Sequence, residues 1–580
     1  TRSNSPLKTY TRTLSFSEGS GKPPSSMDGS NRSPVSSVEE QSSVTRRSGN
    51  YPPNLWDFDF LRSLGDAATV DEGQLKVAEK LKAQVRSLIL QPMEPLPKLE
   101  LLDAVRRLGI KYHFETEFKA ALVSISLDDT HSWWAGSLHA TALRFRLLRE
   151  NGIFVPQDVF AIFEKDFEAH LCDVKGLLSM YEASFLGWEG DDILDHAQKF
   201  AFNQLRSIGT EISPPTLAKM VRRALDLPLH WRAIRYEARW YIDVYKQDED
   251  INPSLIQFAM LDFNIVQSSH QQEMSRLIRW WAATGMDKVP FARNGIMQSY
   301  MYSVGMLFEP HFGEIREMEA KMGAIITTID DIYDAYGTLE ELQLFTDIVQ
   351  RWDLAKADQL SDNINMTLLT MFNTSNEIGN WILKENKFDG APYTAGLWID
   401  QINSYIKEER WLHEGYKPTL AEYMENALVS LGFPNLLVTS YLLTIDHPTK
   451  EKLEYGCNLP LIARASSILC RMINDLGTSQ AEVERGDTIK SIHCYMNETG
   501  ASLEAAYEHI RGLVLLWWKR LNKCFFDPSP LTEPFLSFNI NVVRGSHFFY
   551  QYGDGFGNAE SWTKELAMSS LVHPLHLIDE

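Results

Sequence analysis

Paired cysteines, long apolar runs and an excess of basic residues are all missing from this sequence. Its five cysteines are scattered over 580 residues without a Cys-x-x-Cys pair, so neither a zinc site of paired cysteines nor a disulfide framework is indicated. No apolar stretch approaches the roughly 20 residues of a membrane-spanning helix. With 56 Lys and Arg against 77 Asp and Glu, the net charge is −21. This acidity argues against nucleic acid as a partner, because phosphate backbones bind basic surfaces.

The period of two that marks β-strands is also absent, whereas the helical period is common. Apolar residues recur at three- and four-residue spacing in Glu72–Leu90 and in residues 214–225, so we predict an all-α protein. A chain of this length exceeds one ordinary core. The polar stretch 246–253 ends in Asn-Pro and predicts a joint between an N-terminal helical domain (46–250) and a C-terminal domain (251–580).

The first 45 residues differ in composition from the rest of the chain. They are rich in Ser and Thr, with scattered basic residues and few acids. This composition is typical of the remnant of an organellar transit peptide with a disordered lead-in, and an ordinary disordered tail is the alternative. We expect a protein of the plastid (chloroplast) stroma, without a membrane span, that is a monomer.

The most informative stretch is an apolar run that leads directly into Asp330, Asp331 and Asp334. Asp330 and Asp334 are predicted to lie one helical turn apart on one face, about 6 Å along the axis. Like charges at the end of an apolar run are costly unless a cation neutralises them, and such hard oxygen ligands suit Mg²⁺. A solvated acidic helix end is the alternative that the pattern alone leaves open.

A second copy of the same pattern occurs at Asp191, Asp192 and Asp195. This copy follows Trp-Glu-Gly and opens a helical segment, where acidic side chains cap free N–H groups and interact favourably with the helix dipole. We therefore interpret it as a helix start, and context alone separates the two copies.

Another oxygen-rich stripe is predicted near the C-terminus. Asn474, Thr478 and Glu482 recur every four residues, so amide, hydroxyl and carboxylate groups follow one another over two turns and suit a hard cation. Arg471 lies one turn earlier on nearly the same face, where its fork of N–H donors suits a diphosphate. An amphipathic helix with a polar face is the alternative. Two such helices in one domain indicate a clamp of three Mg²⁺ ions around a diphosphate.

With these motifs in order, the sequence resembles plant terpene synthases from about residue 46 to the C-terminus. Arg46, Arg47 and Trp56 match the RRx8W element of the monoterpene synthases, and Arg293 stands at the family's RxR element. The aspartates resemble its DDxxD motif. The resemblance implies an α-barrel-like N-terminal domain and a class I C-terminal fold. It also implies Mg²⁺-dependent ionisation of geranyl diphosphate with release of diphosphate.

The resemblance also implies roles for single residues. The first and third aspartates of the DDxxD motif hold two Mg²⁺ ions, with Asp331 in support, and the Asn, Thr and Glu side chains hold the third; Mn²⁺ is a substitute. Arg293 and Arg471 bind the diphosphate. The N-terminal strand with its two arginines and Trp56 folds back as a lid. The expected pocket residues are Tyr302, Tyr550 and Asp554, with Tyr333 and the aromatic run at 547–550 as further candidates and a helix break at 430–434.

Two positions depart from the family pattern. The second arginine of the RxR element is Gly295 here, and Tyr302 replaces a Trp seven residues beyond that element. Tyr is a weaker cation–π partner than Trp. A loosely held diphosphate and a weaker aromatic partner disfavour the isomerisation that cyclisation requires, so we expect an acyclic product of the ocimene, myrcene or linalool type.

Four alternatives remain open from the sequence. The first is a monoterpene cyclase of the pinene, sabinene or terpineol type, and the second is a sesquiterpene synthase that uses farnesyl diphosphate. The third is a prenyl chain-elongating transferase, although such enzymes carry two aspartate-rich motifs in one helical domain. The last is a non-enzymatic helical scaffold with acidic stripes, which predicts neither Mg²⁺ dependence nor release of diphosphate.

Overall fold

The computed structural model describes residues 46, 51, 53–68, 70–127, 133–164, 171–208, 212–484, 489–557 and 561–577, with the side chains of 67, 480–484 and 561 outside the description. The chain separates into two units, Thr1–Arg47 and Ser48–Glu580. Only Arg46 of the first unit is among the described residues, and all the described helices lie in the second unit.

Within the described residues, all regular structure is helical, which confirms the predicted all-α class. The predicted helices at Glu72–Leu90 and 214–225 are α2 and α9. The first half of the unit contains α1 (Phe58–Ala67), α2 (Glu72–Leu90), α3 (Pro95–Arg107), α4 (Glu115–Ser126), α5 (Leu138–Glu150), α6 (Ala161–Glu164), α7 (Val174–Ser184), α8 (Asp192–Ile208), α9 (Pro215–Asp226) and α10 (Ile234–Tyr245).

The second half contains longer helices and carries the predicted metal motifs. Its helices are α11 (Pro253–Ala283), α12 (Ile296–Met306), α13 (Gly313–Asp331), α14 (Leu339–Arg351), α15 (Asp362–Asn386), α16 (Ala391–Glu414), α17 (Leu420–Ser430), α18 (Phe433–Thr444), α19 (Lys450–Cys457), α20 (Leu461–Glu484), α21 (Ser491–Thr499), α22 (Leu503–Cys524), α23 (Phe535–Tyr550) and α24 (Ser561–Ala567).

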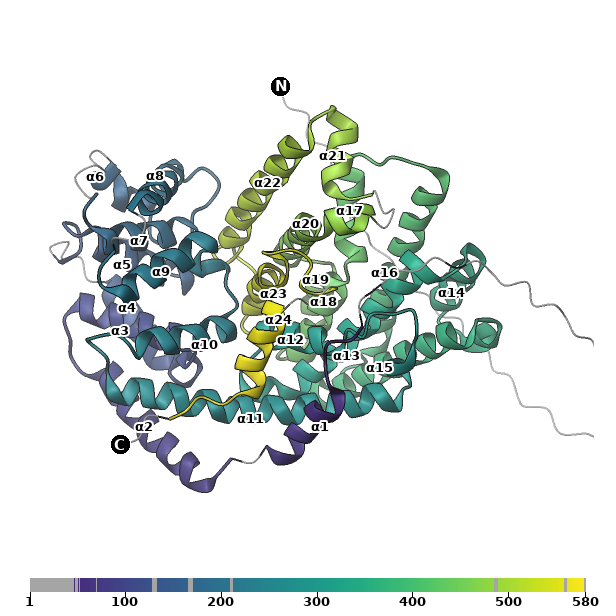
Figure 1. Ribbon diagram of the computed structural model, residues 1–580, viewed down its shortest axis with the longest axis horizontal. Coiled ribbons are helices and arrows are strands. Elements are labelled where there is room, and N and C mark those ends of the chain that lie inside the picture. The colour runs from purple at the N-terminus through teal and green to yellow at the C-terminus, as the bar shows by residue number, and fades with distance from the viewer. Residues whose placement is uncertain are drawn as a thin grey trace, which may run out of the picture. The chain divides into compact units, whose positions relative to one another are not determined.

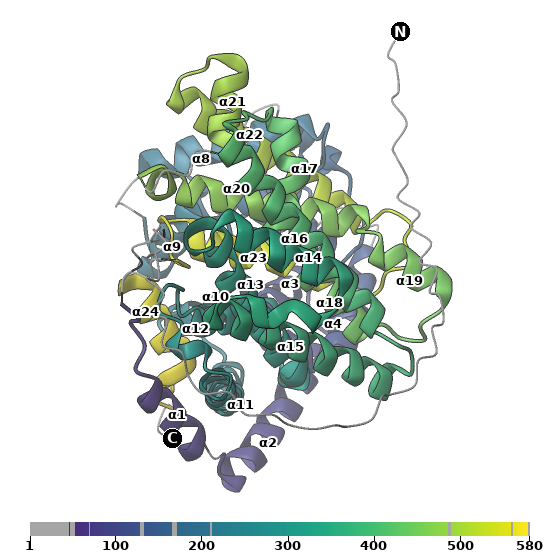
Figure 2. The ribbon, with the colours of Figure 1, turned by 90° about the vertical axis from the view of Figure 1, so that its right-hand side faces the viewer.

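Two hydrophobic cores hold these helices together, and α11 contributes to both. Its first half, for example Phe258, is buried among the N-terminal helices, whereas its second half, for example Trp281, belongs to the core of the C-terminal helices. Figure 1 shows α11 running beneath both groups of helices. In Figure 2 the same helix is viewed almost end-on, with α1 and α2 beside it.

The polar stretch at 246–253 lies between α10 and α11. Asn252 caps α11 by accepting a hydrogen bond from the backbone N–H of Leu255 at 3.0 Å, and Pro253 occupies the first helical turn, where its missing N–H costs nothing. The division at residue 250 stays a prediction, because α11 packs in both cores and the short α1 before the N-terminal helices packs on α11.

The second Asp-Asp-x-x-Asp copy starts a helix, as its context predicts. Asp191 precedes α8, and its carboxylate accepts hydrogen bonds from the backbone N–H of Trp188 and from Arg149, each at 2.8 Å. Asp195 pairs with Lys519. These carboxylates therefore have structural partners inside the fold.

The predicted helix break at 430–434 is present. Helices α17 and α18 meet at an angle of 45°, and Gly432 between them has a φ of +89°. A Cβ atom at Gly432 would lie 2.9 Å from the side chains of Ile326 and Gln401, so both the backbone and the space favour glycine there. Of the helices described, none alone is long and apolar enough to cross a membrane, although this bent pair passes the same test by length and composition.

Candidate active site

The aspartate motif lies where α13 ends. The α-helix stops at Asp331, and residues Ile332–Tyr336 continue as a wider π-helical turn, in which the backbone N–H of Gly337 bonds to the carbonyl of Ile332 at 2.7 Å. Such turns are frequent at functional sites. The Asp334 side chain is exposed and that of Asp330 is one-third exposed, whereas Asp331 is fully buried. The sequence predicted a regular helical turn here, so the widened turn is a difference.

Asp331 is directed at Arg293. Its carboxylate accepts hydrogen bonds from the backbone N–H of Arg293 at 2.7 Å and from Nε of the same residue at 2.9 Å. The guanidinium also donates to Asp330 at 2.6 Å. Burial alone would lower the pKa of Arg293, but the adjacent carboxylates of Asp331 and Asp330 hold it above its usual value. The second aspartate thus fixes an arginine, and the first is shared between that arginine and the open side of the helix.

The two residues after Arg293 take part in the packing of the C-terminal helices. Asn294 turns toward the core and accepts a hydrogen bond from Nε1 of Trp281 at 2.8 Å. Gly295 precedes α12, and a Cβ atom there would lie 3.2 Å from the side chain of Thr327 on α13. The missing Cβ therefore permits close packing of α12 on α13.

Helix α20 carries the second predicted motif. Nη1 of Arg471 lies 3.2 Å from Oδ1 of Asn474, and Nε donates to the carbonyl of Ala427 at 3.0 Å. Asn474 and Thr478 are both buried. The side chain of Glu482 lies outside the described residues, so its predicted role stays a prediction.

The residue after Asn474 repeats the arrangement seen on α13. Asp475 is fully buried, lies 3.5 Å from Nη1 of Arg471, and accepts hydrogen bonds from Tyr423 at 3.1 Å and from the backbone N–H of Ser491 at 3.0 Å. Adjacent helical residues point about 100° apart, so Asp475 is directed at Tyr423 and Ser491 while Asn474 lies on another side of α20. This role of Asp475 was not predicted from the sequence, although the helical period contains the signal for it.

Helix α16 connects the two motifs. The ring of Tyr405 stacks on Tyr333 with centroids 5.3 Å apart, and burial together with the nearby charges of Asp330, Asp334 and Glu408 raises its pKa. One turn further, Glu408 accepts a hydrogen bond from Ser430 at 2.8 Å.

Ser430 also contacts Arg471 on α20, so it connects α16 to the second motif. Nη2 of Arg471 lies 3.2 Å from the Ser430 hydroxyl, and the nearby charges of Arg471 and Lys490 partly offset the rise in the pKa of Glu408 that burial causes. A continuous series of contacts thus joins the end of α13 to α20, and the two motifs share one region.

Tyr302 lies in an aromatic cluster beside the helix break. Its ring stacks on Phe549 at 5.4 Å and contacts Phe433 at 5.4 Å, and its hydroxyl donates to the carbonyl of Val542 at 2.7 Å. Phe556 packs against the same rings. The cluster gathers four aromatic rings in the interior of the C-terminal helices.

The aromatic run at 547–550 divides between two surroundings. Phe549 belongs to the cluster around Tyr302, whereas Phe548 stacks on Tyr236 at 4.1 Å and His547 stacks on Trp231 at 4.8 Å. Burial lowers the pKa of His547 to about 3, so its imidazole is neutral. His547 and Phe548 therefore face the N-terminal helices, and of these three only Phe549 fits the predicted role.

The C-terminal segment after α23 lies against both motifs. A Cβ atom at Gly477 of α20 would lie 2.8 Å from Tyr550, which places the end of α23 beside the metal-motif helix. Asp554 accepts a hydrogen bond from the backbone N–H of Gly557 at 2.8 Å, and Gly557 lies next to Nη1 of Arg293. Tyr550 and Asp554 thus lie near the residues they were predicted to accompany.

The segment before α1, residues 51 and 53–57, lies against the C-terminal helices and contacts the Asp331–Arg293 ion pair. Trp56 is buried in the core of the C-terminal helices, and the backbone carbonyl of Leu55 accepts a hydrogen bond from Lys564 at 3.2 Å. Tyr51 is hydrogen-bonded to Asp331, and its ring lies 4.9 Å from the Arg293 guanidinium. No motif in the sequence singled out Tyr51. Arg47 lies outside the described residues and Arg46 belongs to the other unit, so their predicted lid role stays a prediction.

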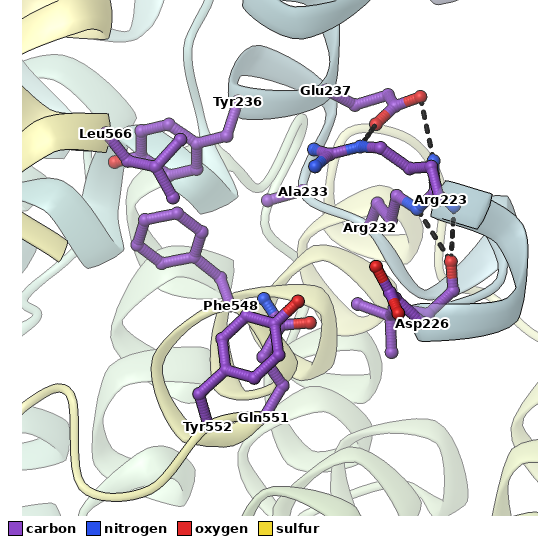
Figure 3. A pocket seen from close by; sticks show the side chains of 11 residues that line it. Arg223, Asp226, Arg232, Ala233, Tyr236, Glu237, Phe548, Gln551, Tyr552 and Leu566 are labelled. Carbon is purple, nitrogen blue, oxygen red and sulfur yellow. Dashed lines mark hydrogen bonds and ion pairs between the residues drawn. The ribbon is translucent and has the colours of Figure 1, made fainter. Parts of the chain in front are cut away.

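A separate pocket lies between α9–α10 and α23–α24 (Figure 3). Its arginines, Arg223 and Arg232, donate to Glu237 at 3.1 and 3.0 Å. Phe548 and Tyr236 face each other across its apolar side. The residues that line this pocket include none of the predicted metal-motif residues, so it is a weaker diphosphate site than the region around Arg293 and Arg471.

The donor set of the two motifs fits a hard cation. Asp330, Asp334, Asn474 and Thr478 offer only oxygen atoms from carboxylate, amide and hydroxyl groups, which is the chemistry that Mg²⁺ prefers. Among the residues with described side chains, which exclude Glu482, no three His, Cys, Asp or Glu groups are gathered as a complete metal site. Any metal held here therefore requires amide, hydroxyl or substrate oxygens as well.

Comparisons with known proteins identify the family of both halves of the chain. Residues 55–225 match the terpene synthase N-terminal domain, and residues 283–520 match the metal binding domain of the terpene synthase family. The chain is 54% identical over 548 residues to a β-bisabolene synthase of Santalum austrocaledonicum and to a (+)-α-terpineol synthase of Santalum album, covering 93% of this chain and 95% of each relative.

Among solved structures, isoprene synthase from grey poplar (Populus x canescens), in complex with three Mg²⁺ ions and dimethylallyl-S-thiolodiphosphate, superposes with a TM-score of 0.84. That structure is 38% identical in sequence and matches 91% of this chain and 100% of its own. The chain belongs to the terpene synthase family, and it is a lyase that acts on a prenyl diphosphate.

Proposed function

We propose that this enzyme holds an allylic prenyl diphosphate between α13 and α20, ionises it with the help of Mg²⁺, and cyclises the resulting cation. The observation that carries the proposal is the series of contacts from Tyr333, beside the aspartates, through Tyr405 and Glu408 on α16 and through Ser430 to Arg471. It brings both oxygen-rich motifs, each with its own arginine, to one region.

Arg293 and Arg471 supply the fixed positive charge. As the C–O bond breaks, both electrons stay on the departing diphosphate oxygen, and the arginines donate hydrogen bonds to the charge that develops there. Asp331 and Asp475 hold these guanidinium groups in place before substrate arrives, so little reorganisation is needed during the reaction.

The proposed metal ligands are the oxygen donors of the two motifs on α13 and α20. Asp330 and Asp334 would hold two Mg²⁺ ions, and Asn474, Thr478 and Glu482 the third; Mn²⁺ is a substitute of the same hard character. Bound Mg²⁺ supplies electrostatic stabilisation of the leaving diphosphate. The three ions in the isoprene synthase complex support this number.

The aromatic cluster is proposed to receive the carbocation. The ring faces of Tyr302, Phe433 and Phe549 attract positive charge without providing a nucleophile. Gly432 interrupts the helix beside Phe433, and the backbone carbonyls at such a break have their negative ends available to a cation. The cation then loses a proton or adds water to give a hydrocarbon or an alcohol.

The product is proposed to be cyclic, which replaces the expectation of an acyclic terpene. That expectation rested on Gly295 and Tyr302. In this structure Gly295 serves helix packing, and Arg293 is firmly held without a second arginine. The relatives at 54% identity are named for bisabolene and α-terpineol, both of which contain a six-membered ring. These observations support ring closure.

Chain length is the finer question. The RRx8W element favours geranyl diphosphate, whereas the bisabolene synthase relative is named for a fifteen-carbon product and the α-terpineol synthase for a ten-carbon one. We keep geranyl diphosphate as the proposed substrate, with farnesyl diphosphate as the competing one. Plastid location likewise stays a prediction, to be tested by imaging a fluorescent fusion of residues 1–45 in plant cells.

The test is incubation of the purified enzyme with each diphosphate in the presence of Mg²⁺, followed by gas chromatography–mass spectrometry. We expect cyclic monoterpenes from geranyl diphosphate, and loss of turnover when EDTA removes the metal. Mainly acyclic products would contradict the proposed cyclisation, and a higher kcat/KM for farnesyl diphosphate would assign the enzyme to sesquiterpene synthesis. No turnover of either substrate would refute the function.

A further inference from the structure

The segment before α1 ends at the charged centre of the site instead of lying free. Tyr51 is half-buried, and its hydroxyl is hydrogen-bonded to Asp331. The face of its ring lies 4.9 Å from the Arg293 guanidinium. One side chain therefore contacts both members of the buried ion pair at the end of α13.

The rest of the segment fixes where Tyr51 lies. Trp56 is 6% exposed and packs in the core of the C-terminal helices. The side chain of Asn54 accepts a hydrogen bond from the backbone N–H of Trp56 at 3.1 Å, and the carbonyl of Leu55 accepts one from Lys564 at 3.2 Å. Tyr51 is thus close in sequence to a well-anchored point.

Arg293 needs this support for a geometric reason. Its Nε and Nη2 atoms are directed at Asp331 and Asp330, which fixes the edge of the guanidinium but leaves its two faces to other groups. The face of the Tyr51 ring is turned toward the guanidinium carbon and adds a cation–π attraction. With Gly295 in place of a second arginine, the orientation of this one guanidinium matters more.

We propose that Tyr51 is a positioning residue for Arg293. Its hydroxyl orients the Asp331 carboxylate, the face of its ring attracts the guanidinium, and together they hold the arginine ready for a diphosphate. The inference rests on the proposed function, because it assumes that Arg293 binds the diphosphate. Tyr51 contacts neither substrate nor metal in this role and acts only through the ion pair.

A double-mutant cycle tests the inference with inorganic pyrophosphate and Mg²⁺ in a calorimeter. Tyr51→Phe removes only the hydroxyl, and one hydrogen bond corresponds to a fall in affinity of about five-fold. Tyr51→Leu also removes the ring, and the fall is expected to reach about twenty-fold. In an Arg293→Lys background, which lacks the planar fork, Tyr51→Leu should cost less than about three-fold, because coupled residues are not additive.

Controls separate positioning from a general loss of fold. Tyr455→Phe, an exposed tyrosine on α19, should leave pyrophosphate affinity unchanged. Thermal melting should place Tyr51→Phe close to the wild type, so that its weaker affinity reflects the site. With prenyl diphosphate, kcat should fall in the same order as the affinity, because the arginine acts on charge that develops in the transition state.

Two results would overturn the inference. One is wild-type pyrophosphate affinity in Tyr51→Leu. The other is an equal loss on removing Tyr51 from the wild type and from the Arg293→Lys variant, which would make its role merely structural. Failure of the proposed function is seen separately, as no turnover of geranyl or farnesyl diphosphate by the wild type. No binding of pyrophosphate by the wild type would refute both.

Discussion

Substitution of the two adjacent aspartates at the end of α13 should have different effects on the stability of the protein. Asp330 is one-third exposed and directed partly toward the open side of the helix, whereas Asp331 is fully buried against Arg293. We predict that Asp330→Ala abolishes turnover while the protein stays folded. Asp331→Ala should instead lower both activity and thermal stability.

The magnitude follows from the contacts. Asp331 accepts hydrogen bonds from the backbone and side chain of Arg293 and from Tyr51, and removing one partner of a buried ion pair costs about 3–5 kcal/mol. Arg293 keeps Asp330 as a second partner at 2.6 Å, so we expect the lower end, about 3 kcal/mol. Asp331→Asn keeps the shape and should cost about half as much, since a hydrogen bond to a neutral group is weaker.

Differential scanning fluorimetry measures the stability, and single-turnover release of diphosphate measures the chemistry. Both are needed because an unstable enzyme also loses activity. Asp191→Ala provides a matched control in the second copy of the pattern, where we expect lower stability through loss of the contacts to Arg149 and Trp188 but an unchanged rate for each folded molecule. If Asp331→Ala melts like the wild type while Asp330→Ala unfolds, the assignment of the two carboxylates is reversed and the reasoning fails.

Three further predictions concern the surrounding residues. Gly432→Ala should lower the melting temperature and change the product distribution seen by gas chromatography. The reason is that the φ of +89° at this position and the 2.9 Å distance to the side chain of Ile326 both disfavour a Cβ atom. An unchanged product distribution would argue against a role for the helix break. Tyr302→Phe should lower the free energy of unfolding by about 1 kcal/mol, because the hydrogen bond to Val542 is lost, and should keep most turnover. Tyr302→Leu should lose turnover as well, because the aromatic ring is gone. Equal activities of the two variants would show that the ring does not face the cation. Burial raises the pKa of the Glu319 carboxyl from 4.5 to about 8. Between these pH values the folded state therefore keeps a proton that the unfolded state releases. The stability that this group contributes is present at low pH and is lost as the pH rises toward 8. The melting temperature of Glu319→Gln should therefore equal that of the wild type at pH 5 and exceed it at pH 8. The same difference in melting temperature at both pH values would contradict the raised pKa.

The sequence was sufficient where local spacing decides the outcome. The helical period predicted α2 at its observed bounds, Gly432 with Pro434 predicted the break between α17 and α18, and the acids after Gly190 predicted the start of α8. Each of these features depends on residues within a few positions of one another. Backbone sterics and capping act over that range, so the pattern contains the information.

The partners of the charged groups could not be predicted in this way. Asp331 meets Arg293 from 38 positions away, and Tyr51 joins them from a segment before the first helix. Asp475 meets the backbone of Ser491, 16 positions further along the chain. Nothing in the local sequence distinguishes a carboxylate that holds an arginine from one that faces a metal, except the direction in which the folded helix turns it.

The sequence by itself therefore determined the helical class, the two oxygen-rich motifs and the family they resemble, because these depend on residue type and spacing along one helix. Tertiary structure alone decided which aspartate is buried, which aromatic rings of the 547–550 run join Tyr302, and that α16 connects the two motifs. Those outcomes depend on which side of each helix is covered by elements distant in the chain. Burial, and with it the strength of every charge interaction in the site, exists only once those elements have packed together.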